Sequence, residues 1–239
     1  MGELRIGCSG WVYKDWTGPF YPAGTKDKDR LAHYVTRFDT AEINASFYRL
    51  PSEAMVEGWR ERTPDDFLFA WKVSRFITHN KKLKDCAEPV ALVWGRMAPL
   101  DGKLGPALVQ LPPMLRRNDD RLASFLKLSP PGRVTIEFRH PSWYDPAVFR
   151  ILSDFDAALC ISDHHHAPAP WELTASWAYV RGHGPGGRYF GRYSDADLRC
   201  WAGQIAEWRR RGLPVHAYFD NDIKSAAPLD ALKLKELSA

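Results

Sequence analysis

Hydrophobic positions along the chain switch between two patterns, one with a period of two residues and one with a helical period. Runs of β-branched and aromatic residues whose side chains alternate between two faces predict β-strands. The predicted strands cover residues 4–9, 40–44, 67–73, 106–111, 157–162, 176–181 and 214–219, and one more begins at Val134. Their starts lie about 30 residues apart on average, which leaves room for a crossover helix between successive strands.

Most of the intervals carry apolar residues three and four positions apart, which predicts amphipathic helices. Helices are expected over residues 30–38, 89–97 and 228–237, and others begin after Ser52, Asn118, Asp145 and Ser194, whose side-chain oxygens suit N-caps. The helix after Ser52 is expected to bury Met55, Val56 and Trp59. Residues 163–173 contain two prolines and no helical period, so no helix is expected there.

Eight strand–helix units in a chain of this length are typical of a (β/α)8 barrel. We therefore predict an α/β fold in which residues 1–239 form a single (β/α)8 TIM-barrel domain with a weak or missing sixth helix. A doubly wound open sheet is the alternative, but the first strand is not followed by the G-x-G-x-x-G fingerprint of dinucleotide-binding folds. No break in composition suggests a second domain.

The composition, with 45% hydrophobic and 26% charged residues, is typical of a soluble globular protein. No apolar run is long enough to cross a bilayer, and no signal region precedes the first strand. The four cysteines show no C-x-x-C spacing, which favours a reducing compartment. We therefore expect a cytoplasmic protein without a membrane partner. The net charge of +4 allows an anionic ligand but is too small to indicate nucleic acid by itself.

Polar and charged residues occupy the last inward-facing positions of nearly every predicted strand. In a barrel these C-terminal strand ends meet at one face, where catalytic residues gather. A buried charge without a partner is costly, so the groups must neutralise one another or bind a ligand. In one interpretation they form an ion-pair lattice that fills the barrel, for example Glu42 with Lys72 and Glu137 with Arg139.

In the other interpretation these strand ends form a substrate site, with Glu42 and Glu137 as the catalytic acid and base. Two carboxylates in different surroundings can be held at different pKa values, as acid–base catalysis requires. The expected substrate-binding residues are Trp11, Tyr48 and Trp143 as stacking groups, Lys72, Arg139 and Arg181 as cations, and Asn44, His79, Gln110, His140, His183 and Asn221 as polar partners.

Two loops admit more than one interpretation. Residues 182–187 are rich in glycine and follow the seventh strand, where barrels often bind phosphate through backbone N–H groups, but an ordinary flexible loop is the alternative. The adjacent His164, His165 and His166 cannot easily converge on one ion, so we expect them in a solvated loop. The sequence requires no cofactor, and it allows but does not indicate a divalent metal, because H-E-x-x-H is absent and H-x-H occurs only within these three adjacent histidines.

A series of short motifs occurs in order along the chain. They are Gly7-x-Ser9-Gly10-Trp11, Glu42-x-Asn44-x-Ser46-Phe47-Tyr48, Lys72-x-x-Arg75-x-x-Thr78-His79, Gln110-Leu111-Pro112, Glu137-Phe138-Arg139-His140-x-Ser142-Trp143 and Tyr179-x-Arg181-x-His183-Gly184. Between about Arg5 and Asn221 the chain resembles the "domain of unknown function 72", or YecE-like, family. The resemblance implies a (β/α)8 barrel in a soluble bacterial-type protein and brings no settled activity. It also predicts Asn at position 220 and at position 230, where this chain has Asp220 and Asp230.

Three functional hypotheses follow. The first is an enzyme, a hydrolase or isomerase, that acts on a polar or anionic small molecule such as a phosphosugar or a glycoside. The second is a nucleic-acid-binding protein or a metal-dependent phosphodiesterase, motivated by the basic charge, the loop aromatics and the histidines near strand ends. The third is a noncatalytic ligand-binding module that uses the same pocket.

Overall fold

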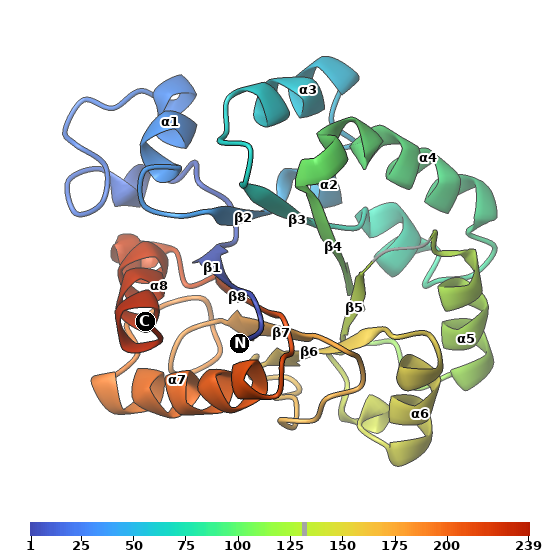
Figure 1. Cartoon of the computed structure of the whole chain (residues 1–239). Helices are drawn as coiled ribbons and strands as arrows, with labels where there is room; N and C mark the ends of the chain where they lie inside the picture. The colour runs from blue at the N-terminus through green and yellow to red at the C-terminus, as the bar shows by residue number, and fades with distance from the viewer. Residues whose placement is uncertain (131–132) are drawn as a thin grey trace.

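The computed structural model describes residues 1–130 and 133–239 and shows eight parallel strands arranged as a barrel (Figure 1). The strands are β1 (Leu4–Cys8), β2 (Thr40–Ile43), β3 (Leu68–Lys72), β4 (Leu104–Gln110), β5 (Val134–Glu137), β6 (Ala158–Ser162), β7 (Ala178–Gly182) and β8 (Val215–Phe219). They pair in the order β1-β8-β7-β6-β5-β4-β3-β2, and every ladder is parallel. The predicted (β/α)8 fold is confirmed.

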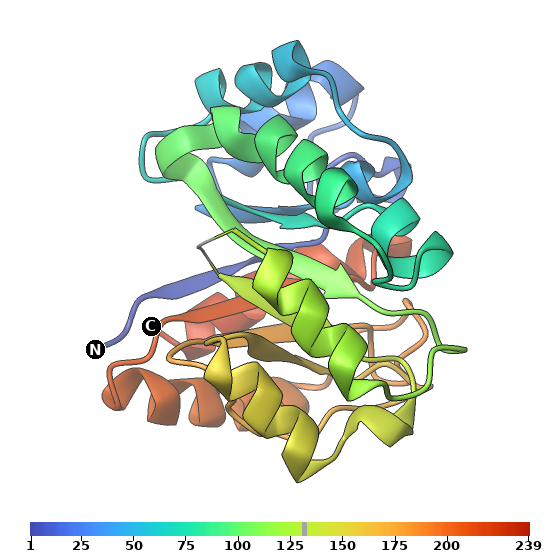
Figure 2. The same cartoon turned by 90° about the vertical axis from the view of Figure 1, so that its right-hand side faces the viewer.

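Helices surround the strands on the outside of the barrel (Figures 1 and 2). They are α1 (Arg30–Tyr34), α2 (Ala45–Tyr48), α3 (Glu53–Glu61), α4 (Ala87–Met97), α5 (Asp119–Leu128), α6 (Pro146–Asp154), α7 (Asp195–Arg210) and α8 (Ala226–Leu237). Short helical turns are η1 (Lys14–Trp16), η2 (Asp27–Asp29), η3 (Phe76–Asn80), η4 (Ala98–Lys103), η5 (Pro141–Trp143) and η6 (Ile223–Ser225). No helix lies between β6 and β7 in the described chain, which confirms the expected gap.

The predicted N-caps set where four of these helices begin. Ser52 accepts a hydrogen bond from the Met55 amide, Asn118 caps α5, Asp145 caps α6, and Ser194 forms a capping box at the start of α7. One expectation about α3 is wrong, because Met55 is 49% exposed while Val56 and Trp59 are buried. Among the described helices, none has both the length and the apolar character needed to cross a membrane.

The barrel closes between β1 and β2 through very few backbone contacts. A single bridge joins Ser9 to Glu42, where the Gly10 amide donates to the Glu42 carbonyl at 2.8 Å. Below this bridge, the Tyr34 hydroxyl accepts from the Cys8 amide at 2.8 Å and donates to the Thr40 carbonyl at 3.0 Å. One tyrosine on α1 therefore joins the two strands that have no ladder between them.

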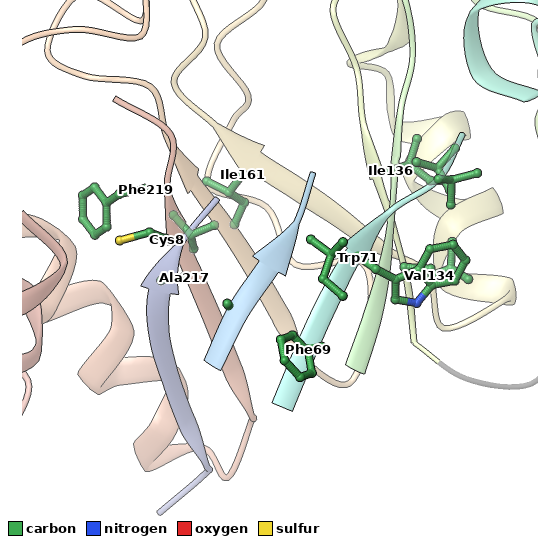
Figure 3. Close-up of a cluster of buried hydrophobic side chains, with 14 of the residues drawn as sticks. Cys8, Phe69, Trp71, Val134, Ile136, Ile161, Ala217 and Phe219 are labelled. Atoms are coloured by element: carbon green, nitrogen blue, oxygen red, sulfur yellow. The ribbon is translucent and has the colours of Figure 1, made fainter. Parts of the chain in front are cut away.

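Side chains of the strands divide into an outer and an inner core. Outward-facing residues such as Cys8, Phe69, Trp71, Ile136 and Phe219 pack in one large cluster with the helices (Figure 3). Inward-facing residues form a smaller cluster of Ala70, Leu108, Ala158, Cys160, Trp177, Tyr179 and Tyr218. This alternation is the period-two pattern of the sequence, and it directs the next inward residue of each strand toward the C-terminal end of the barrel.

Candidate functional site

A buried charged layer covers the apolar barrel interior at the C-terminal ends of the strands. Arg181, on β7, lies at its centre and is fully buried. Its guanidinium contacts three carboxylates, with Nη2 at 2.7 Å from Glu42, Nη1 at 3.0 Å from Glu137 and Nη2 at 2.9 Å from Asp220. These acids come from β2, from β5 and from the residue after β8, so a single cation joins three sides of the barrel.

Glu42 uses both carboxylate oxygens in hydrogen bonds within the protein. Oε1 accepts from Arg181 and from the Ser9 hydroxyl, and Oε2 accepts from Arg181 at 3.0 Å and from the Tyr179 hydroxyl at 2.6 Å. Burial acts to raise the pKa of Glu42, but the charge and hydrogen bonds of Arg181 outweigh it and hold that pKa below its usual value. Glu42 is therefore ionised and fully bonded.

Glu137 is bound in a similar way. Its Oε2 accepts from Gln110 and from Arg181, both at 3.0 Å, and its Oε1 accepts from Arg139 at 2.6 Å. Burial again acts to raise the pKa of this carboxyl, but Arg139 and then Arg181 hold the pKa of Glu137 well below its usual value. Both glutamates are therefore ionised at neutral pH, and more acid is needed to protonate them than to protonate an ordinary glutamate.

Only one of the two ion pairs suggested for a lattice is present. Glu137 pairs with Arg139 as expected, whereas Glu42 pairs with Arg181 and not with Lys72. The planar guanidinium of Arg181 donates from two nitrogens to the two oxygens of Glu42, a paired geometry that the single nitrogen of lysine does not provide. Lys72 is left outside the pairing.

A cavity of about 640 Å³ opens at the mouth of the barrel and is called the mouth cavity below. Five residues predicted for the site line it, namely Asn44, Tyr48, Lys72, His79 and Gln110. The other lining residues are Tyr13, Phe47, Arg75, Tyr189, Asp220 and Asp222. Gln110 and Asp220 connect this wall to the charged layer, since they also bind Glu137 and Arg181.

Lys72, the last residue of β3, is a charged residue of the cavity wall that has no polar partner in the described chain. The residue is only 7% exposed, and its Nζ lies 4.4 Å from the centroid of the Phe47 ring. Within residues 1–130 and 133–239 its amine makes no hydrogen bond and no ion pair. Burial, and secondly the positive charge of Arg181, lower the pKa of Lys72 to about 8.

Two oxygens in the cavity wall are buried without a hydrogen-bond partner among the described residues. They are Oδ1 of Asn44, whose amide nitrogen donates to the Ser9 hydroxyl at 2.5 Å, and Oδ1 of Asp222. Burial, and then the negative charge of Asp220, raise the pKa of Asp222 to about 9. Asp222 is therefore a neutral carboxylic acid at physiological pH and can donate a proton into the cavity.

The remaining polar wall combines a neutral imidazole with an exposed cation. His79 packs edge-on against Phe47 at 5.1 Å, and its Nδ1 lies 2.9 Å from the Thr78 hydroxyl. Burial, followed by the charges of Lys72 and Arg75, lowers the pKa of His79 to about 4, so the ring is uncharged near neutral pH. Arg75 is exposed and has no ion-pair partner in the described chain.

Arg139 and His183 support the cavity wall from below. Arg139 donates to the Tyr189 hydroxyl at 3.0 Å, and the His183 ring packs edge-on against Tyr189 at 5.1 Å. The His183 amide and ring are held by Asp163, with the amide donating at 2.7 Å. These two predicted site residues therefore position a lining residue and do not line the mouth cavity themselves.

Four other predicted site residues lie away from the mouth cavity. Trp143 is buried against Phe138 and donates its indole N–H to the Leu115 carbonyl at 2.8 Å, so its ring cannot stack on a substrate. His140 accepts from the Ser142 amide and shapes a turn. Asn221 bonds the Gly191 carbonyl and Asp230 of α8.

Trp11, the fourth, lines a separate pocket of about 510 Å³ between the loop after β1, α1 and α3. Its ring packs edge-on against Trp59 at 5.9 Å. Tyr13 and Asn44 line both this pocket and the mouth cavity, so the two spaces are neighbours. Trp11 therefore lies beside the predicted site and outside its polar part.

The glycine-rich loop after β7 does not present the amides of His183, Gly184 and Gly187 to a phosphate. The Gly184 amide donates to the Tyr193 hydroxyl at 2.8 Å and the Gly187 amide to the Gly184 carbonyl at 2.7 Å. A Cβ at Gly184 would lie 2.2 Å from the Phe190 carbonyl oxygen, so this glycine permits close packing of the loop. These glycines have a packing role.

The histidine run differs in part from the expectation of a solvated loop. His165 and His166 are exposed, but His164 is 3% exposed and packs edge-on against His183 at 5.2 Å. Burial, and then Arg139, lower the pKa of His164 to about 2. In the described chain no group of three or more His, Cys, Asp or Glu residues is arranged to hold a metal ion.

Sequence reasoning missed several lining residues because they come from loops. Tyr13, Tyr189 and Asp222 lie in the loops after β1, β7 and β8, where the alternation of a strand carries no information. A signal existed for Asp222, since Asp220 and Asp222 flank Asn221 directly after β8. Two acids this close at a strand end suggest a coupled pair with one raised pKa.

Comparison with known proteins identifies the family. The profile of the family described as "Protein of unknown function DUF72" matches residues 5–239. The UPF0759 protein YecE of Escherichia coli (strain K12) is 36% identical over 144 residues, which are 59% of this chain and 50% of that protein. The chain thus matches about half the length of this relative. The UPF0759 protein YunF of Bacillus subtilis (strain 168) is 26% identical, over 98% of this chain and 94% of the relative.

Solved structures share the architecture. A DUF72 family protein from Thermotoga maritima has a TM-score of 0.90 at 26% identity, covering 98% of both chains. A D-psicose 3-epimerase has a TM-score of 0.54 at 13% identity, covering 98% of this chain and 95% of that one, which shows a likeness of fold alone. The family profile spans nearly the whole sequence, and we conclude that the chain belongs to the DUF72 family of proteins of unknown function.

Proposed function

We propose that this chain is an enzyme that acts on a small, polar, anionic molecule in the mouth cavity, with Lys72 and Asp222 as the groups that exchange protons. The observation that carries the proposal is the amine of Lys72. Lys72 lines the cavity and is only 7% exposed, and apart from its contact with the Phe47 ring its amine makes no hydrogen bond and no ion pair in the described chain. A largely buried lysine whose amine faces a cavity without an anionic partner suits a ligand that carries a negative charge.

The charges on the wall favour an anionic ligand. Lys72 and Arg75 are cations without ion-pair partners in the described chain, whereas the Asp220 carboxylate is bound to Arg181, which it shares with Glu42 and Glu137. His79 and Asp222 are uncharged near neutral pH, because the pKa of the first is lowered and that of the second is raised. The wall therefore carries a net positive charge in the absence of a ligand.

The neutral groups favour a hydroxylated ligand with a ring or a carbon chain. Asn44 and Asp222 add polar side chains to the wall, and hydroxyl groups form hydrogen bonds with amide and carboxyl groups. Tyr13, Phe47 and Tyr189 offer aromatic surface on the same wall. A phosphosugar combines hydroxyl groups, a carbon skeleton and negative charge, and it fits a cavity of about 640 Å³.

Lys72 and Asp222 suit proton exchange because burial lowers the pKa of Lys72 from 10.5 to about 8 and raises the pKa of Asp222 from 3.8 to about 9, which brings the two values close together. Glu42 and Glu137 are assigned a different role, since both are ionised and bound to Arg181. They fix the guanidinium below the cavity and position the wall. Glycoside hydrolysis, which needs a carboxyl pair at the substrate, is therefore less well supported than an isomerisation.

The test has a binding arm and a turnover arm. Calorimetry with a sugar phosphate, the matching uncharged sugar and a single-stranded oligonucleotide compares wild type with Arg75→Gln, and with Arg199→Gln on the exposed face of α7 as the matched control. We expect the sugar phosphate to bind, Arg75→Gln to weaken it about tenfold, and Arg199→Gln to leave it unchanged. Preference for the oligonucleotide, or equal binding by wild type and Arg75→Gln, contradicts the proposal.

For turnover, sugar phosphates are incubated with the protein in heavy water, and exchange of carbon-bound hydrogen is followed by NMR. Wild type is expected to catalyse exchange into at least one member of the panel. Lys72→Met and Asp222→Asn are expected to lose exchange, while Arg199→Gln retains it. Binding without exchange into any member would indicate a noncatalytic module and overturn the enzymatic part of the proposal.

A further inference from the structure

We infer that Lys72 forms a covalent imine with the carbonyl carbon of its ligand, so that the mouth cavity takes an anionic aldehyde or ketone. This inference rests on the function proposed above and narrows it to one substrate class. It is carried by geometry: the amine lies at the end of β3 on the cavity wall, beside the Phe47 ring and without a polar partner in the described chain.

A comparison with the other buried lysine of the protein shows what is distinctive about Lys72. Lys103 is 8% exposed, so its burial is nearly the same. Its Nζ, however, donates to the carbonyl oxygens of Thr63 at 2.6 Å and Arg60 at 2.7 Å. Lys103 is therefore held as a structural ammonium, whereas Lys72 lines the mouth cavity and its amine contacts the Phe47 ring without a hydrogen bond in the described chain.

Charges facing the Lys72 amine come from every side of the barrel mouth. They belong to Glu42 on β2, Glu137 on β5, Arg181 on β7 and Asp220 after β8, while Arg75 and the uncharged His79 beyond β3 line the same cavity. The acids among them are already paired with arginines, and burial together with Arg181 lowers the pKa of Lys72 to about 8. Near neutral pH an appreciable fraction of this amine is therefore unprotonated, as a nucleophile must be.

The chemical step can be written with groups present in the cavity. The neutral amine attacks the carbonyl carbon, a C–N bond forms, and the C=O π pair moves to oxygen, which takes the proton of the Asp222 carboxyl. The Asp222 carboxylate then removes a proton from nitrogen and returns it to the hydroxyl, which leaves as water. The products are a protonated imine, one water molecule and an Asp222 carboxylate, and no oxidant or reductant is needed.

Three probes that share a three-carbon skeleton separate the requirements of the site. Glyceraldehyde phosphate carries both carbonyl and anion, glycerol phosphate carries the anion alone, and glyceraldehyde carries the carbonyl alone. Each is incubated with the full chain and sodium cyanoborohydride, which reduces an imine to a stable secondary amine. Peptide mass spectrometry then gives the labelling rate of every lysine, with Lys103 and the surface lysines as internal references.

We expect glyceraldehyde phosphate to label Lys72 at least about tenfold faster than any surface lysine, because far more of its amine is unprotonated near neutral pH. Labelling of Lys72 should rise with pH to a midpoint near 8, against about 10.5 for an ordinary lysine. Glyceraldehyde should label it more slowly, and glycerol phosphate should compete with the labelling. Lys72→Arg should abolish the fast labelling while labelling of the surface lysines is unchanged.

Labelling of Lys72 no faster than that of the surface lysines overturns the imine. If glycerol phosphate still binds in that case, the proposed anion site stands and only the covalent step is removed. If neither phosphate binds and Lys72 is not labelled selectively, both proposals are contradicted. Selective labelling of Lys72 that glycerol phosphate does not reduce contradicts the anion site and leaves the reactive amine in place.

Discussion

Arg181 and Glu42 are joined through both carboxylate oxygens, with Nη2 to Oε1 at 2.7 Å and Nε to Oε2 at 3.0 Å, and both side chains are fully buried. The pair crosses the barrel from β7 to β2 and lies where these strands open into the mouth cavity. Because the two residues satisfy each other, they form the fixed base of the site. The groups left free for a ligand lie above them.

Replacing one partner of this pair should destabilise the whole barrel. Glu42→Gln removes a buried negative charge and leaves Arg181 incompletely compensated, so we expect a loss of about 3 kcal/mol in the free energy of unfolding. Urea denaturation followed by tryptophan fluorescence measures this loss. Glu207→Gln breaks an exposed pair with Arg210 and is the control, with an expected change below about 0.5 kcal/mol. Equal effects of the two substitutions would show that the buried pair does not support the fold.

Gly7 should be essential for closure of the barrel. A Cβ at this position would lie 2.3 Å from the Thr40 carbonyl oxygen, which is a backbone atom of the neighbouring strand. We therefore expect Gly7→Ala to cost about 2 kcal/mol of unfolding free energy by pushing β1 away from β2. Gly95→Ala in α4 meets no atom within 4 Å and should instead stabilise by about 0.5 kcal/mol. A neutral effect of Gly7→Ala in thermal unfolding would rule out the close approach of the strands.

His216 should make the protein sensitive to mild acid. Its ring is buried on β8, 3.0 Å from an Arg133 nitrogen, and burial followed by the charge of Arg133 lowers its pKa from 6.5 to about 3. Below pH 6.5 the unfolded chain binds a proton that the folded chain refuses until about pH 3, so stability falls as the pH is lowered through this window.

His216→Gln keeps a hydrogen-bonding side chain at this position and removes the titration. Between neutral pH and about pH 5, wild type should lose up to about 2 kcal/mol more unfolding free energy than the variant. Other histidines with lowered pKa values, His79 and His164, are present in both proteins and cancel in the comparison. Parallel stability curves for the two proteins would contradict a buried neutral His216.

The alternation of side chains along single strands was sufficient to predict much of the fold and the inward direction of the site. Each strand needs only its own period of two to place Glu42, Lys72, Gln110, Glu137 and Arg181 inside the barrel, and all five face inward at its C-terminal end. The ion pairs between these side chains could not be predicted in the same way. Whether Glu42 meets Lys72 or Arg181 depends on side-chain reach across the barrel, which no local pattern contains.

Loop residues account for most of the other differences between the predicted site and the structure. Trp143 follows a charged strand end and has an indole ring that could stack on a ligand. The short turn η5 instead directs its ring against Phe138 and its N–H to Leu115. Asp222 and Tyr189 reach the cavity because of backbone paths that have no sequence period. The same limit applies to Met55, which is 49% exposed although its neighbours Val56 and Trp59 on α3 are buried.

Titration of the Lys72 amine by NMR is the most direct test of this account. Lysine labelled with ¹³C at Cε gives one signal for each side chain, and the signal missing from Lys72→Arg assigns the residue. An uncommitted amine in the mouth cavity predicts a midpoint near pH 8 for Lys72, while Lys103, which is held by two carbonyl oxygens, serves as the buried reference. A Lys72 midpoint at or above 10.5 would show an ordinary ammonium and contradict the central claim.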